Sequence, residues 1–271
     1  VTYNIPDIAG TTATITATYA GDTTYLGSTG TGTLTISAMN HAPVAADGTL
    51  NPAARKWTVL VFMNADNDLE MFGVQDLNEM ELAPPSDQVA TVVQFDRSPG
   101  YDTSQGNWTG SRRYLVQHDT DMGTIGSTLL ETMGDVDMGN ATTLRDFIAW
   151  GKAAYPAEHY LLVIWNHGSG WRSRTTAATR GVSFDDTSGT FIRTVDLPSA
   201  LATDVPFDLI AWDASLMQML EIAYQIRNNA DYLVGSEESP PGAGYHYVDW
   251  LTPLVNNPSM TAAQLGALSS D

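Results

Sequence analysis

The chain has 271 residues, of which 43% are hydrophobic and 9% aromatic, so it can bury the core of one substantial domain and a smaller one. Its net charge of -19 argues against nucleic acid or an anionic membrane as a partner, because phosphate binding needs clustered cations. No apolar run is long enough to span a bilayer, and the absence of cysteine excludes disulfides and thiolate zinc sites.

Residues 1–38 are rich in Thr, Gly and Ala and predict β structure. Polar and apolar residues alternate over 12–19 and again over 32–37, with turn residues between them, which is typical of half-buried strands. Residues 17–28 resemble the end of a bacterial immunoglobulin-like repeat, although an unrelated β-hairpin would give a similar pattern. Residues 39–56 lack periodicity and are interpreted as a linker.

From Trp57 onward, short apolar runs alternate with helical patterns. The expected strands lie at 58–63, 89–95, 160–165, 209–212 and 232–234, and the expected helices at 69–82, 141–154, 196–202, 216–228 and 261–268. This alternation predicts an α/β fold with a mainly parallel sheet and helices on both faces. Ligands of such sheets bind at the carboxyl ends of the strands, which here are residues 64–68, 96–97, 166–170 and 213–215.

The chain begins within strand-like sequence, without a starting Met or signal peptide, and ends directly after a helical pattern. We therefore expect a piece of a longer protein. The domain over 57–271 is expected to lack a C-terminal portion.

Two polar segments follow buried strands and are candidates for catalysis. His167 comes directly after one strand and opens a Gly-x-Gly loop, where an imidazole can act as general base or acid near neutral pH. Asp213 ends a later strand, and a helix is expected to begin near Ser215, with free N–H groups that could hold an oxyanion. Taken singly, the two residues would be a loop histidine and a helix N-cap.

The segments 165–171, Trp-Asn-His-Gly-Ser-Gly-Trp, and 213–217, Asp-Ala-Ser-Leu-Met, together resemble the clostripain family of cysteine endopeptidases, in the caspase-like clan. That family ends one strand in Asn/Asp-His-Gly-x-Gly-Trp and a later one in Asp-Ala-Cys-Leu-Met, so this sequence departs from it at the cysteine. The resemblance covers 57–271 and implies a caspase-like α/β/α sandwich.

The resemblance assigns roles to individual residues. His167 corresponds to the catalytic histidine and Ser215 to the nucleophilic cysteine, with the N–H groups of Gly168 and Ser215 as the oxyanion hole. Asp213 corresponds to an acid of the primary specificity pocket, which implies protein or peptide substrates cleaved after Arg and secondarily Lys. The alternative is that loop N–H groups satisfy the Asp213 carboxylate.

Serine at the nucleophile's place predicts an inactive or nearly inactive protein. A thiol with a pKa of about 8.5 readily forms a thiolate beside His, whereas a serine hydroxyl needs a well-placed base and orienting acid. Two explanations for Ser215 are open: an engineered exchange of cysteine for serine, or a natural pseudo-enzyme or atypical serine peptidase. We favour the exchange, because removal of one cysteine would also explain why the chain has none.

The resemblance also implies self-cleavage, which in this family usually occurs at a basic residue between the histidine and cysteine strands. Arg172, Arg174 and Arg180 lie in that stretch among small polar residues, which suits an exposed and easily cut loop. Arg174 is the first choice and Arg180 the second. The alternative is a surface loop whose arginines offset nearby acids.

Several acidic or amide residues are weaker candidates. Asn64 could orient His167, although a turn residue explains it as well, and Glu237 or Glu238 could add to the specificity pocket. The segments Asp66–Asp68 and Asp185–Ser188 offer hard oxygen ligands for calcium, but neither completes an EF-hand loop. The resemblance implies that no cofactor is required and that calcium can assist.

Two hypotheses of different class follow. The first is a secreted or cell-surface bacterial endopeptidase directed at arginine, with its nucleophile replaced. The second is a binding or adhesion module that uses a dead peptidase domain beside immunoglobulin-like repeats. A serine hydrolase of the α/β-hydrolase type is excluded, because no Gly-x-Ser-x-Gly elbow surrounds Ser215.

Overall fold

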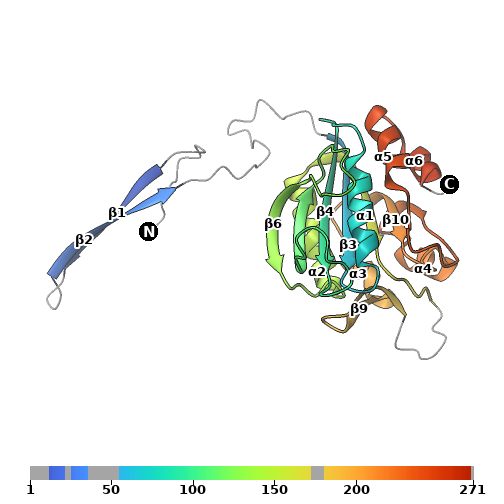
Figure 1. The fold of residues 1–271 in the computed structure, drawn as a ribbon, viewed down its shortest axis with the longest axis horizontal. Helices are drawn as coiled ribbons and strands as arrows, with labels where there is room; N and C mark the ends of the chain where they lie inside the picture. Colours follow the sequence, from blue (N-terminus) through green and yellow to red (C-terminus); the bar gives the residue numbers. More distant parts are fainter. Residues whose placement is uncertain (1–11, 22–25, 36–54, 172–179, 270–271) are drawn as a thin grey trace. The chain divides into compact units, whose positions relative to one another are not determined.

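The computed structural model describes residues 12–21, 26–35, 55–171 and 180–269, in two units, Val1–Asn51 and Pro52–Asp271. The first unit contains an antiparallel hairpin of β1 (Thr12–Gly21) and β2 (Leu26–Thr35) (Figure 1). The first predicted strand is confirmed, and the second begins at Leu26 rather than Gly32. Membership of an immunoglobulin-like repeat stays a prediction.

The second unit is built on a seven-stranded sheet with the order β11-β10-β7-β3-β4-β5-β6. The five predicted strands are its parallel part: β3 (Arg55–Ala65), β4 (Val89–Arg97), β7 (Ala157–Trp165), β10 (Phe207–Asp213) and β11 (Ala230–Val234). β3 includes Arg55 and Lys56, the last two residues of the expected linker 39–56, and the rest of that stretch lies outside the described residues.

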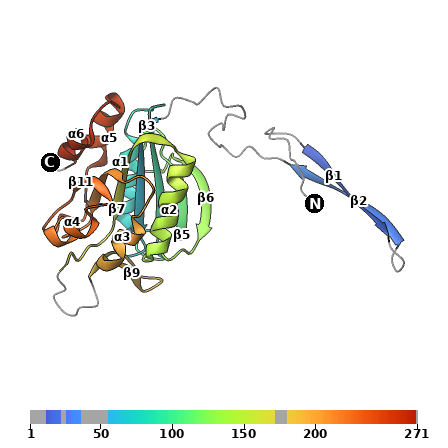
Figure 2. The same cartoon turned by 180° about the vertical axis from the view of Figure 1, so that it is seen from behind.

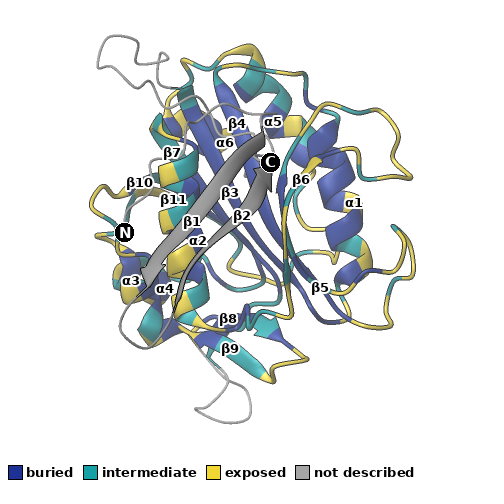
Figure 3. Ribbon diagram, turned by 90° about the vertical axis from the view of Figure 1, so that its left-hand side faces the viewer, coloured by how far each residue is buried: buried dark blue, intermediate teal, exposed yellow. Residues whose placement is uncertain are grey.

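Two antiparallel strands at one edge were not predicted, β5 (Gly110–Leu115) and β6 (Thr128–Gly134). They carry no continuous apolar run, because β5 contains two arginines and β6 is largely exposed. Figure 3 shows the same contrast between the buried central strands and the outer strand β6. β5 is held by pairing to β4 and β6 by pairing to β5, which local sequence does not report.

Helices cover both faces of the sheet (Figures 1 and 2). The helices α1 (Glu70–Glu81), α5 (Tyr247–Asn256) and α6 (Ala262–Leu268) pack on one face, and α2 (Ala141–Ala154), α3 (Leu197–Ala200) and α4 (Leu220–Ile226) on the other. Alternate residues of β3 enter the two cores, Val61 on the α1 side and Phe62 on the α2 side. The predicted mixed α/β fold with a mostly parallel sheet and helices on both faces is confirmed.

The helix expected over 196–202 is shorter, a 3-10 turn (Thr194–Asp196) followed by α3, and α5 was not predicted. A small hairpin of β8 (Gly181–Asp185) and β9 (Thr190–Arg193) lies at the carboxyl ends of β3 and β7. It is held there because Asp186 N–H donates to the Asp66 carbonyl at 2.8 Å and Phe184 N–H to Asn166 Oδ1 at 2.8 Å. No helix among the described residues is both long and apolar enough to cross a bilayer.

Candidate active site

The two candidate catalytic segments leave the sheet side by side. In the pairing of β7 with β10, Trp165 lies opposite Asp213, and the N–H of Asn166 donates to the Asp213 carbonyl at 3.1 Å. The loop that begins at His167 and the loop that begins at Ala214 therefore start at the same level of the sheet. Both segments lie at the carboxyl edge of the sheet, as the sequence predicts, and the pairing of β7 with β10 makes them neighbours.

Glycines let the backbones of the two loops touch. A Cβ atom on Gly168 would lie 2.3 Å from the Ser215 carbonyl oxygen and 2.9 Å from Cγ of Met217. Gly170 has a φ of +59°, and its Cβ would lie 2.8 Å from the Leu216 carbonyl oxygen. No real side chain fits at these separations, so the Gly-x-Gly pattern is a packing requirement of the site.

Replacement of Gly168 by alanine is expected to push the two loops apart and to lower the free energy of unfolding by about 1–3 kcal/mol, as for other overpacked positions. Urea denaturation of the variant measures this loss. Gly123→Ala is the matched control, because its Cβ would meet only Asp121 Oδ1, at 3.3 Å. Equal stabilities of the two variants would contradict the assigned contact.

Ser215 does not begin a helix, which corrects the expectation of a helix from this residue. Residues 215–218 form turns, Leu216 has a φ of 66°, and α4 begins only at Leu220 with Met219 as its N-cap. A left-handed residue cannot continue an α-helix, so the positive φ at Leu216 breaks the predicted element. Ser215 is therefore not an N-cap, and the N-terminal N–H groups of α4 do not surround it.

The turn after Ser215 is held by the loop that follows β11. The N–H of Leu216 donates to the Glu238 carbonyl at 3.0 Å, and that of Gln218 to the Ser236 carbonyl at 3.1 Å. Within the part of the chain that the structure describes, neither the Gly168 N–H nor the Ser215 N–H donates a hydrogen bond. These two predicted donors are thus available to a bound oxygen atom.

His167 has a carboxylate partner that sequence reasoning missed. Its Nε2 lies 2.7 Å from Oδ1 of Asp68, and both side chains are largely exposed. A carboxylate only accepts, so this contact favours the Nε2–H tautomer and leaves Nδ1 as the basic nitrogen.

Asn64, the predicted partner of His167, is instead buried and donates to Ser183 Oγ at 3.0 Å and the Phe184 carbonyl at 3.2 Å. Asn64 is part of β3, which places its side chain toward β8. Asp68 lies past the end of that strand. The sequence placed 64–68 at the ligand-binding edge but offered no way to choose among them.

Asp213 is buried beneath the loop that precedes α5. Both carboxylate oxygens accept from the Tyr245 N–H at 3.3 Å, and Oδ2 accepts from the Tyr247 hydroxyl at 3.0 Å. A Cβ on Gly244 would lie 2.3 Å from Oδ1, so a glycine is needed above the carboxylate. The alternative predicted for Asp213, a carboxylate held by loop donors, is therefore present, and each oxygen keeps further lone-pair capacity.

Burial dominates the electrostatics of Asp213. Desolvation raises the pKa of Asp213 to about 7, the hydrogen bonds from Tyr245 and Tyr247 lower it, and the charge of Glu79 raises it. Asp76 on α1 is also buried, and desolvation together with the Asp213 charge raises its pKa well above the ordinary value. The Asp76, Glu79 and Asp213 side chains thus form an acidic group behind the site.

The remaining predicted residues lie apart from this centre or outside the described residues. Arg172 and Arg174 lie outside the described residues. The Arg180 guanidinium stacks 4.6 Å from the Trp171 ring centroid, and its carbonyl accepts from Thr194 N–H at 3.1 Å. Glu237 and Glu238 are exposed, the latter beside Leu216 through its carbonyl.

Residues 61–271 match the model of the clostripain family. Clostripain of Hathewaya histolytica is 27% identical over 215 residues, which is 71% of this chain and 41% of the relative. A secreted cysteine protease from Bacteroides thetaiotaomicron, solved with an irreversible peptide inhibitor, is 28% identical with a TM-score of 0.63, covering 79% of this chain and 58% of that one. An inactive zymogen protease from Parabacteroides distasonis is 25% identical with a TM-score of 0.59, covering 76% and 55%.

The chain spans about half the length of the relatives that it matches. The family model covers both loops of the site and the whole seven-stranded sheet except residues 55–60 of β3. The chain belongs to the clostripain family of cysteine peptidases.

Proposed function

We propose that this chain is the peptidase unit of an endopeptidase that cleaves after Arg, and secondarily Lys, by a Cys–His dyad whose cysteine is replaced by Ser215. The observation that carries the proposal is the contact of the His167 and Ser215 loops, where the Gly168 backbone lies against the Ser215 carbonyl. His167 acts as the base and later the acid, and the Gly168 and Ser215 N–H groups receive the oxyanion of the scissile carbonyl.

The environment of Ser215 supports an inactive or nearly inactive form. A serine nucleophile needs an orienting acid that keeps imidazolium stable in a water-poor site. The carboxylate that contacts His167, Asp68, has an exposed side chain, so solvent weakens its effect on the ring. A cysteine needs less help, because its thiol loses the proton far more readily.

The acids behind the site support a preference for basic residues. Asp213 provides a buried carboxyl group, the charge of Glu79 acts on it, and exposed Glu238 lies beside the turn that follows Ser215. A guanidinium that reached Asp213 would form a strong charge-assisted pair and stabilise its ionised form. Arg suits this geometry better than Lys, because its planar fork can contact two oxygen atoms.

Asp68 is expected to act as a positioning residue for His167. In a protein with cysteine at position 215, Asp68→Asn should lower kcat about tenfold and leave KM nearly unchanged, because the ring loses its preferred tautomer and substrate contacts remain. Asp186→Asn, an exposed acid that has no contact with His167, is the control. An unchanged kcat in Asp68→Asn, or a loss of kcat equal to that in Asp186→Asn, would contradict the role.

Self-cleavage after Arg174 is proposed for the cysteine form. The supporting observations are the position of Arg174 in the chain between the two catalytic loops and the description of one similar structure as a zymogen. Arg180 is the weaker candidate, because the Thr194 N–H holds its carbonyl at the start of β8. Secretion is proposed from the secreted relative, and an immunoglobulin-like repeat from the β1–β2 hairpin.

A binding or adhesion module is the second proposal, supported by the serine at the nucleophile's place. Exchange of Ser215 for cysteine separates the two proposals in an assay with fluorogenic peptides ending in Arg, Lys or Asp. Cleavage after Arg that disappears on replacement of His167 supports the peptidase. Silence on all three substrates by a folded protein supports the binding module.

A further inference from the structure

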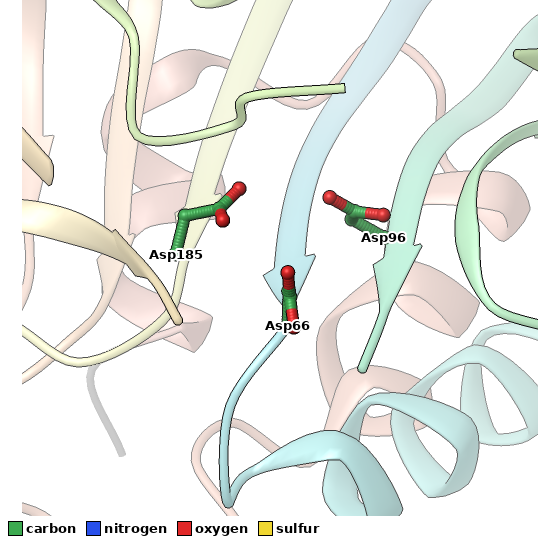
Figure 4. Close-up of side chains that lie close together, drawn as sticks. All are labelled: Asp66, Asp96 and Asp185. Carbon is green, nitrogen blue, oxygen red and sulfur yellow. The ribbon is translucent and has the colours of Figure 1, made fainter. Parts of the chain in front are cut away.

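Three aspartates from distant parts of the chain meet at the carboxyl edge of the sheet. Asp66 directly follows β3, Asp96 lies near the end of β4, and Asp185 ends β8. One carboxylate oxygen from each lies within 4.8 Å of the other two, and each residue is at most 2% exposed. Figure 4 shows the three carboxylates turned toward one another. Among the described residues, no other group of three or more His, Cys, Asp or Glu side chains lies close enough together to hold a metal ion.

Two of the oxygens in this cluster have no hydrogen-bond partner although they are buried. These are Oδ1 of Asp66 and Oδ2 of Asp96. The other oxygens are engaged: Asp66 Oδ2 accepts from Thr187 N–H at 3.2 Å, and Asp96 Oδ1 from Arg97 N–H at 3.1 Å. Buried acceptors without a donor are costly, so the two oxygens point to a ligand that the protein itself does not supply.

Asp185 has both oxygens directed by backbone N–H groups. Oδ1 accepts from Ser188 at 2.7 Å and Oδ2 from Met138 at 2.9 Å. Such bonds fix the carboxylate's orientation and leave one or more lone pairs on each oxygen for a cation. The third carboxylate of the cluster is therefore held in place rather than neutralised.

The three carboxylates repel one another. Burial, and then the charges of Asp185, Asp66 and Asp135, raise the pKa of Asp96 to about 8. Arg97 does not compensate, because its guanidinium donates to Glu70 Oε1 at 2.7 Å and to the carbonyls of Asp102 and Ser104. A bound cation would remove the repulsion among the three carboxylates and satisfy both orphan oxygens.

The oxygen spacing suits calcium. Ca²⁺ takes oxygen ligands at about 2.3–2.6 Å, so two ligands on opposite sides of the ion lie up to about 5 Å apart, whereas Mg²⁺ at about 2.0–2.1 Å draws them within about 4 Å. The three oxygens fall inside the calcium limit at 4.8 Å. Hard carboxylate ligands also favour Ca²⁺ over transition metals, which prefer nitrogen and sulfur.

We propose that Asp66, Asp96 and Asp185 bind one calcium ion that fastens the β8–β9 hairpin to the ends of β3 and β4. Each of the two acidic segments singled out in the sequence contributes one ligand, and Asp96 joins them from β4. Asn67 and Asp68 are not ligands: the Asn67 amide donates to the Phe184 carbonyl at 2.9 Å, and Asp68 contacts His167. The ion would also steady residues 66–68, which carry the His167 partner.

Isothermal titration calorimetry and thermal unfolding test the site without any need for activity. Protein stripped with EDTA is expected to bind Ca²⁺ with a Kd on the order of 10⁻⁵ to 10⁻³ M, and its unfolding midpoint should rise by about 5 °C in excess Ca²⁺. Mg²⁺ should give a smaller rise. Absence of both binding heat and a thermal shift with Ca²⁺ would overturn the proposal, and an equal response to Mg²⁺ would overturn the assignment to calcium.

Asp96→Asn and Asp186→Asn form a matched pair, because each replaces one carboxyl group by an amide and only the first removes a ligand. Asp186 is exposed, and the asparagine keeps the backbone N–H that donates to Asp66. Asp96→Asn should weaken Ca²⁺ binding at least about tenfold, yet unfold in EDTA at the same temperature as the unsubstituted protein or higher, because repulsion is relieved. Asp186→Asn should bind Ca²⁺ normally.

A purely structural role for Asp96 predicts a different pattern, with the same loss of stability in EDTA and in Ca²⁺. That result, or Ca²⁺ binding by Asp96→Asn as tight as by Asp186→Asn, would overturn the proposal. Should Asp96→Asn not fold, Asp66→Asn serves in its place, since the orphan Oδ1 of Asp66 faces the same space. Circular dichroism of each variant establishes that it is folded before titration.

Discussion

Exchange of Ser215 for cysteine is expected to raise kcat/KM on peptides ending in Arg by about 10⁴-fold or more, because loss of a nucleophile costs a peptidase on the order of 10⁶ in kcat. The thiol needs only His167 to form a thiolate, whereas the serine hydroxyl lacks a buried orienting acid. The contact of Gly168 with the Ser215 backbone is unchanged by the exchange, so the geometry of the two N–H donors is retained. Release of a fluorogenic group from Arg, Lys and Asp peptides measures the gain.

Two controls decide how the gain is interpreted. Ser215→Ala should match the Ser215 protein, and His167→Ala in the cysteine form should abolish the gained activity, since His167 is the proposed base. Intact-mass analysis of the cysteine form reports self-cleavage, with Arg174 as the expected site. A cysteine form that stays uncut in this loop would defeat the self-cleavage proposal, while cleavage of added peptides would still support the peptidase.

Asp213→Asn in the cysteine form is expected to lower kcat/KM on Arg peptides by about 10²- to 10³-fold, because truncating one partner of a buried charged pair costs roughly 2–5 kcal/mol. Peptides with a neutral residue before the scissile bond should change far less. Glu238→Gln is the control for the exposed acid beside Leu216, and it should lower Arg cleavage by less than about tenfold because solvent screens the charge. An unchanged preference for Arg in Asp213→Asn would contradict the assignment of Asp213 to the primary specificity pocket.

The raised pKa of Asp213 adds a signature in stability. The folded carboxyl has a pKa of about 7, whereas the unfolded value is about 3.9. Between these two pH values the folded protein therefore binds more protons than the unfolded chain. The protonated Asp213 carboxyl contributes its full stabilisation below about pH 3.9, and this stabilisation is lost as the pH rises to about 7. Asp213→Asn does not titrate there, so the stability of the Ser215 protein relative to this variant should fall by about 2–3 kcal/mol from pH 5 to pH 8.

Urea unfolding of both proteins at several pH values measures that difference. The same ionisation affects binding: affinity for a peptide ending in Arg should weaken as the pH drops below about 7, because the proton competes with the guanidinium for Asp213. The Asp213→Asn protein should lack this component. A stability difference that rises with pH would show that Asp213 is ionised readily in the fold and would contradict its desolvation.

The sequence by itself determined the parallel core and the two loops that carry His167 and Ser215. Buried parallel strands require continuous apolar runs, so β3, β4, β7, β10 and β11 could be read directly from the sequence. The rule that ligands bind at carboxyl ends then placed His167 and Ser215 at one edge of the sheet, and the pairing of β7 with β10 makes their loops neighbours. Glycines at 168 and 170 marked a close backbone approach, although their partner, the turn after Ser215, was not apparent from the sequence.

Only the tertiary structure decided what depends on contacts between distant segments. The helix pattern at 216–228 gave no warning of the left-handed Leu216, which is held by the Glu238 carbonyl from beyond β11. The choice of Asp68 over Asn64 as the partner of His167 depends on where β3 ends relative to β8. Asp66, Asp96 and Asp185 converge for the same reason: periodicity reports which face a residue takes, but only packing brings carboxylates from three strands to one point.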